Sequence, residues 1–285
     1  MPTISINDTS LYFEDSGPAE SGETIVFSHG LLWNVRMFDA QVEARRQHFR
    51  CVAYDHRGQG SSAECTLRSI DIDLVYRDAV ALIEALDLGA VHFCGLSMGG
   101  FVAMRLGARR PDLVRSLILI ETAARPERAE RIRKYRVFNV LFRWFGYRTV
   151  ADRIMPIMFG RSVLADPARA TERAAWRRLL AGNRHSVWRA VNGVIERQGV
   201  EDELGRIAAP TLVIVGEEDT ATPPEDAERL IALIPKSQLV RIPAAGHSST
   251  VEQPALVNAA IGSFLQGARG AERRERIRLP ASDDE

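Results

Sequence analysis

The stretch VHFCGLSMGG, residues 91–100, places one serine among glycines at the end of an apolar run. The apolar run is typical of a buried strand, and a helical pattern follows it over residues 98–110. Glycine permits dihedral angles and close backbone approaches that side chains forbid, so Gly95 and Gly99 predict a sharp strand-to-helix turn around Ser97. A chain built around this turn must pack a strand beside a helix, which favours an α/β fold.

The rest of the chain alternates in the same way. Strand-like runs are TISIND and SLYFED, which form a predicted hairpin, and then ETIVFS, FRCVAYD, AVHFC, RSLILIE, TLVIVG and SQLVRIP. Helical spacing of apolar residues occupies residues 72–88, 98–110, 224–234 and 254–266. Strands and helices that alternate at these distances predict a mostly parallel sheet with helices on both faces and the hairpin as an antiparallel edge.

Two segments break this alternation. Residues 125–205 contain no convincing strand and are rich in Arg, Trp, Phe and Met, so we interpret them as a helical insertion. Residues 267–285 are charged and almost free of large apolar side chains, which predicts a flexible tail. The core domain is then formed by residues 1–124 and 206–266.

Composition narrows the classes of partner. Lys and Arg number 37, as do Asp and Glu, and this balance argues against a nucleic acid or an anionic membrane as partner. The spacing of Cys51, Cys65 and Cys94 suits neither a disulfide nor a metal site, and no signal-peptide pattern or membrane-spanning apolar stretch is found. We therefore expect a cytoplasmic protein that acts on a small molecule without a metal or cofactor. The oligomeric state stays open, a homodimer included.

Ser97 is the predicted nucleophile, and a serine hydroxyl needs a neighbouring base. His247 follows the last predicted strand, at the carboxyl edge of the sheet where ligand-handling groups collect. An acidic side chain must orient that base. Asp219 is favoured because it follows TLVIVG at a distance that lets the loop turn inward, while Glu218 and Glu121 remain alternatives.

Acyl transfer also requires donors for the oxyanion. The N–H of Met98, directly after the nucleophile, is one candidate. The loop SHGLLWN follows the third predicted strand, and Gly30 lets its backbone turn close to the serine. The N–H of Leu31 is therefore the second candidate.

These landmarks resemble those of the α/β-hydrolase superfamily. SHGLL, YDHRGQGSS, GLSMGG, VGEEDTATPP and AAGHSSTVEQP are similar to its successive motifs, in order, across residues 4–265. RMFDAQV, CVAYDHRGQGSS, CGLSMGG and ETAARPE are most similar to enol-lactonases of the 3-oxoadipate type and to cofactor-free haloperoxidase-like esterases. The resemblance implies an eight-stranded α/β-hydrolase sheet and a helical cap, residues 125–205, over Ser97. It also implies that no cofactor is needed.

The cap supplies candidates for a substrate pocket. Tyr135, Phe138, Phe142 and Phe145 fall on one helical face. The predicted pocket residues are Trp33, Phe138, Phe142, Met155, Met158 and Trp188. The alternative is that these side chains only pack the cap onto the core.

The favoured function is a serine hydrolase that cleaves a carboxylic ester or lactone through an acyl-enzyme. Hydrolysis of a carbon–carbon bond in a ring-cleavage product is an alternative, because related enzymes use the same triad. A small-molecule receptor that retains hydrolase architecture is a third hypothesis. The sequence does not choose among substrates.

Overall fold

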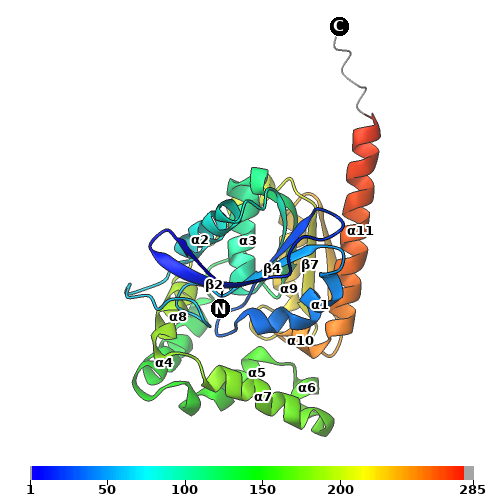
Figure 1. Cartoon of the computed structure of the whole chain (residues 1–285). Helices are drawn as coiled ribbons and strands as arrows, with labels where there is room; N and C mark the ends of the chain where they lie inside the picture. Colours follow the sequence, from blue (N-terminus) through cyan, green and yellow to red (C-terminus); the bar gives the residue numbers. More distant parts are fainter. Residues whose placement is uncertain (1, 279–285) are drawn as a thin grey trace.

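The protein, described here over residues 2–278 of a computed structural model, is built on one eight-stranded sheet (Figure 1). The strand order is β1-β2-β4-β3-β5-β6-β7-β8. The first two strands form an antiparallel hairpin, β2 pairs antiparallel with β4, and all other neighbours are parallel. The strands are β1 (Thr3–Ile6), β2 (Thr9–Asp15), β3 (Thr24–Ser28), β4 (Arg50–Tyr54), β5 (Val91–Leu96), β6 (Val114–Ile120), β7 (Thr211–Gly216) and β8 (Ser237–Ile242).

Helices cover both faces of this sheet. One apolar cluster joins Val26 of β3 to α2 (Ile72–Ala85), α3 (Met98–Arg109) and α9 (Pro224–Leu233). The other joins Ile25 and Phe27 of the same strand to α11 (Pro254–Arg278), against which α1 (Asp39–Arg45) packs. Neighbouring residues of a strand point to opposite faces, so the continuous apolar run of β3 serves both clusters. The predicted α/β fold, with its mostly parallel eight-stranded sheet, is confirmed.

All regular elements described between β6 and β7 are helical. They are α4 (Ala129–Phe145), α5 (Ala151–Met158), α6 (Arg161–Ala165), α7 (Ala170–Ala181) and α8 (Trp188–Ile195). Figure 1 shows α4 to α7 as a layer of their own beside the sheet. Short 3₁₀ helices occur at Val35–Phe38, Pro111–Leu113, Tyr147–Thr149, Pro167–Arg169, His185–Val187 and Glu201–Arg206, and the short α10 (Ser249–Glu252) precedes α11.

The expected tail differs from the structure at its start. Helix α11 does not end at residue 266 but continues to Arg278. The added segment is rich in Ala, Glu and Arg, which have high helix propensity. Residues 279–285 of the expected tail lie outside the described residues. Among the described residues, no helix is both long and apolar enough to cross a membrane.

Candidate active site

Ser97 occupies the turn between β5 and α3, where the backbone is strained. Its φ of 52° and ψ of −107° lie outside the regions that a non-glycine residue normally adopts. A Cβ on Gly95 would lie 2.2 Å from the carbonyl oxygen of Gly99, and one on Gly99 would lie 2.0 Å from that of Ser28. Neither backbone can give way, so both positions require glycine. The glycines that suggested this turn are therefore the residues that allow it.

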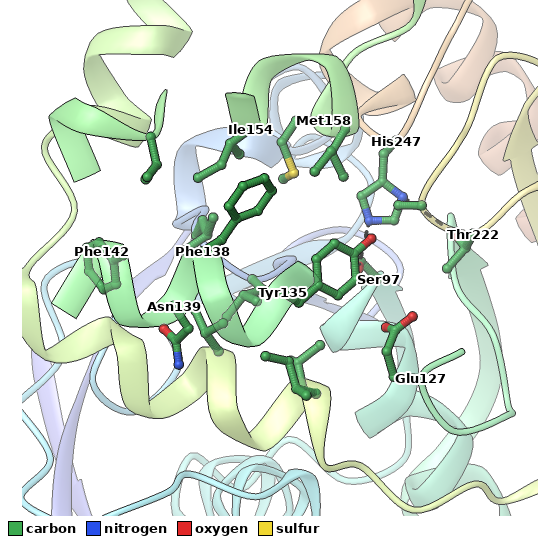
Figure 2. A pocket seen from close by; sticks show the side chains of 18 of the residues that line it. Ser97, Glu127, Tyr135, Phe138, Asn139, Phe142, Ile154, Met158, Thr222 and His247 are labelled. Carbon is green, nitrogen blue, oxygen red and sulfur yellow. Dashed lines mark hydrogen bonds between the residues drawn. The ribbon is translucent and has the colours of Figure 1, made fainter. Parts of the chain in front are cut away.

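Three side chains from three separate loops meet at the carboxyl edge of the sheet. Ser97 Oγ lies 2.9 Å from His247 Nε2 (Figure 2), and His247 Nδ1 lies 2.8 Å from Asp219 Oδ2. Ser97 follows β5, Asp219 follows β7 and His247 follows β8. His247 and Asp219 are buried. The arrangement links a hydroxyl, an imidazole and a carboxylate in one hydrogen-bonded chain.

The Asp219 carboxylate is surrounded by donors. Oδ1 accepts the N–H groups of Ala221 at 2.7 Å and Thr222 at 3.1 Å, and Oδ2 accepts the Thr222 hydroxyl at 2.8 Å. Burial opposes ionisation, but His247 and these hydrogen bonds outweigh it and hold the pKa of Asp219 below its ordinary value. Asp219 is therefore an anion at neutral pH. Thr222 was not predicted from the sequence, where nothing distinguishes it from the other small polar residues of its loop.

The two alternative acids have other roles in the structure. Glu121, fully buried directly after β6, accepts the N–H of Gly216 at 2.9 Å and is hydrogen-bonded to Asp219. Burial and the neighbouring Asp219 charge raise the pKa of Glu121 well above its ordinary value, so it is the protonated partner of this carboxyl pair. Glu218 accepts the N–H of Ser162 at 2.8 Å and thereby contacts the helical insertion.

The two candidate oxyanion donors flank the serine. A Cβ on Gly30 would lie 3.4 Å from the Ser97 Cβ, so the loop that carries Leu31 passes against the nucleophile. Met98 is the first residue of α3, and the leading N–H groups of a helix have no intrahelical acceptor. Within residues 2–278, neither the Leu31 nor the Met98 N–H donates to another protein group.

A cavity of about 140 Å³ opens beside Ser97 and His247, between the sheet edge and helices α4, α5 and α8 (Figure 2). Three of the six predicted pocket residues, Phe138, Phe142 and Met158, line it. The side chains around it are mostly apolar. Those that the sequence did not single out include Leu32, Phe101, Tyr147, Val150, Ile154, Ile157, Val191, Val194 and Ile195.

The other three predicted pocket residues do not lie on the cavity wall. Trp33 is buried edge-to-face against Phe159 and Trp176, so it packs the insertion onto the core. Met155 is buried in the same apolar cluster. The ring of Trp188 contacts the guanidinium groups of Arg143 and Arg189, which lie 4.5 Å and 4.6 Å from its centroid. In the structure these three side chains pack within the protein, and their role in substrate binding stays a prediction.

One side of the cavity is polar. Arg197 and Glu127 both line it and form a buried ion pair with an Nη1–Oε2 distance of 2.8 Å. The Arg197 guanidinium also lies 4.5 Å above the Phe101 ring. Tyr135 and Asn139 complete this side. Because the chain carries many arginines, no sequence signal separated Arg197 from those on the surface.

Glu252 holds the loop that carries His247. Its carboxylate accepts the N–H groups of Gly246 at 2.9 Å and Ser248 at 3.1 Å, one on each side of the histidine. It also accepts the N–H of Gly160, in the helical insertion, at 2.8 Å. Burial raises the pKa of Glu252 to about 7, against the lowering effect of these three donors.

Cys51, Cys65 and Cys94 do not line the cavity. All three cysteines are free and buried, and burial raises the pKa of Cys51 to about 12. Burial also raises the pKa of Cys94. Among the described residues, no three His, Cys, Asp or Glu side chains gather as a metal site requires.

Comparison with known proteins places the chain in a family. Residues 25–260 match the Alpha/beta hydrolase family, and the protein belongs to it. It is 27% identical over 264 residues to 3-oxoadipate enol-lactonase 2 of Acinetobacter baylyi, an alignment that covers 93% of this chain and 96% of the relative.

Solved structures give the same result. A thermophilic esterase from Thermogutta terrifontis superposes with a TM-score of 0.83 at 32% identity, covering 91% of this chain and 94% of the esterase. The enol-lactonase from Burkholderia xenovorans superposes with a TM-score of 0.85 at 27% identity, covering 93% and 100%. The predicted resemblance to hydrolases of this type is confirmed.

Proposed function

We propose that the protein is a serine hydrolase that cleaves a carboxylic ester or lactone through an acyl-enzyme on Ser97. The observation that carries the proposal is the hydrogen-bonded chain from Ser97 through His247 to Asp219 at the mouth of an apolar cavity. Relatives named as an enol-lactonase and an esterase support the class of substrate.

In the proposed reaction, Ser97 Oγ attacks the substrate carbonyl carbon while His247 Nε2 takes the hydroxyl proton. Asp219, held as an anion, fixes the tautomer with the proton on Nδ1 and stabilises the imidazolium. The Leu31 and Met98 N–H groups bind the oxyanion. His247 returns the proton to the leaving alcohol, and water activated by the same imidazole releases the acid.

The cavity limits the size and the charge of the substrate group that is attached to the carbonyl. Its volume of about 140 Å³ is close to that of an engineered apolar cavity, about 150 Å³, that binds benzene. The paired charges of Glu127 and Arg197 leave its polar side without a net charge. We therefore propose an uncharged acyl or alcohol group of about benzene size.

The test is initial-rate hydrolysis of p-nitrophenyl esters from acetate to octanoate, with lactones followed by pH-stat. We expect kcat/KM to rise about fourfold per added methylene until the cavity is filled, because each buried methylene contributes about 0.8 kcal/mol. Ser97→Ala should lower kcat by about 10⁵–10⁶-fold. Ser263→Ala, on the exposed surface of α11, is the matched control.

Three results would contradict the proposal. Turnover that survives Ser97→Ala would show that another group performs the attack. A folded protein that cleaves a ring-cleavage diketo acid but no ester or lactone would instead be a carbon–carbon bond hydrolase. Ligand binding without any turnover would favour the receptor hypothesis.

A further inference from the structure

The outer face of α4 is apolar and open to solvent. Four of the six exposed large apolar side chains among the described residues lie on this one helix. Val137 and Val140 are more than half exposed, and the rings of Trp144 and Phe145 are 72% and 67% exposed. Val137, Val140 and Trp144, spaced by three and four residues, form one stripe, and Phe145 lies beside it at the C-terminal end of the helix. The cavity-lining side chains of α4 (Tyr135, Phe138, Asn139 and Phe142) lie on the side opposite this stripe.

The same helix concentrates positive charge. Seven Arg and Lys residues lie between positions 128 and 148, against the single acid Glu130. The exposed ones include Arg133, Lys134, Arg136 and Arg143. Within residues 2–278, none of these four is in an ion pair with an acidic side chain. We expected no membrane partner because the net charge of the whole chain is zero. That argument does not apply to α4, where positive charge is in local excess.

These features point to one kind of partner. Bulky apolar side chains with Trp and Phe, bordered by Arg and Lys, are what a helix needs to lie in the interface of an anionic bilayer. A second copy of the chain fits this face poorly, because a two-fold contact would place the unpaired cations of both helices against one another. Helix α4 belongs to the layer of helices beside the sheet (Figure 1), and its four large apolar side chains are exposed to solvent.

We propose that the outer face of α4 (Val137, Val140, Trp144 and Phe145, with Arg133 and Arg136) docks on an anionic lipid surface. The rings insert at the level of the acyl-chain boundary, and the guanidinium groups bind lipid phosphates. Because the opposite side of α4 lines the cavity, docking brings the cavity next to the lipid. The proposal does not depend on the hydrolytic reaction.

The test is co-sedimentation of the full chain with vesicles of phosphatidylcholine alone or mixed with phosphatidylglycerol. We expect binding only to the mixed vesicles, weakened by salt. Arg133→Gln/Arg136→Gln should lower the partition coefficient roughly thirtyfold, since each cation contributes roughly fivefold. Trp144→Ser/Phe145→Ser should lower it roughly a hundredfold or more, since each buried large apolar side chain contributes roughly tenfold to a hundredfold.

Leu67→Ser/Arg68→Gln is the matched control, because it removes an exposed apolar side chain and an exposed cation that are not part of α4. This variant should bind mixed vesicles like the wild type. Circular dichroism checks that each variant is folded. Failure of the wild type to bind mixed vesicles at low salt overturns the proposal, as does undiminished binding by Trp144→Ser/Phe145→Ser. A concentration-dependent dimer abolished by that variant, without vesicle binding, would also overturn it and assign the face to a second copy.

Discussion

Replacing Glu252 by Gln tests the electrostatics of the loop that carries His247. The glutamate carboxyl has a pKa raised to about 7 in the folded protein, against an ordinary value of 4.5. Gln has nearly the same shape but no charge. The folded state binds a proton at Glu252 more tightly than the unfolded state does. Ionisation of this group therefore costs stability as the pH rises from 4.5 through 7.

The magnitude follows from the shift of about 2.5 units. At about 1.36 kcal/mol per unit, the complete effect is about 3.4 kcal/mol, of which about 2.5 kcal/mol develops between pH 5 and pH 8. We expect the free energy of unfolding of the wild type, minus that of Glu252→Gln, to fall by about this amount over that interval. At pH 5 about three quarters of the stabilisation by the protonated carboxyl is present, and at pH 8 almost none of it remains.

Urea denaturation at pH 5 and pH 8, followed by fluorescence, measures both free energies. Glu64→Gln, exposed and away from the loop, is the control for the chemical change itself. If the free energies of unfolding of wild type and Glu252→Gln differ by the same amount at both pH values, the reasoning is refuted. Glu252 would then have the same pKa in the folded and the unfolded state. A difference that rises with pH would mean that the three N–H donors outweigh burial.

Three further substitutions follow from the site. Asp219→Asn should lower kcat by about 10⁴-fold with little change in fold, as measured by ester hydrolysis, because the histidine tautomer is no longer fixed. Gly99→Ala should destabilise the protein by about 3 kcal/mol or more, because its Cβ meets a backbone carbonyl, whereas Gly205→Ala, with open space around it, should not. Phe138→Ala should move the preferred ester to a longer acyl chain, while Phe145→Ala should leave that preference unchanged; equal profiles would contradict the assigned cavity wall.

The meeting of Ser97, Asp219 and His247 was predictable because strand register determines it. Leu96 pairs with Ile120, Ile120 with Ile214, and Gly216 with Ile242, so the carboxyl ends of β5 to β8 lie level with one another. In a parallel sheet, the loops that follow such ends share one edge. Recognising the strands was therefore sufficient to predict that these loops lie close together. It was not sufficient to predict that Thr222 and the protonated Glu121 lie beside Asp219.

The cavity wall was half predictable because no comparable ladder positions the insertion. Its helices are not held in register by strand pairing, so the spacing of apolar residues does not show how far along a helix the contact with the core extends. Helix α4 shows the consequence: Phe138 and Phe142 line the cavity, while Phe145, on the same helical face but at the last residue of the helix, is exposed. Aromatic spacing identified an apolar helix but did not reveal that α4 is apolar on two sides. Only one of those sides belongs to the active site, and the other is left for a partner.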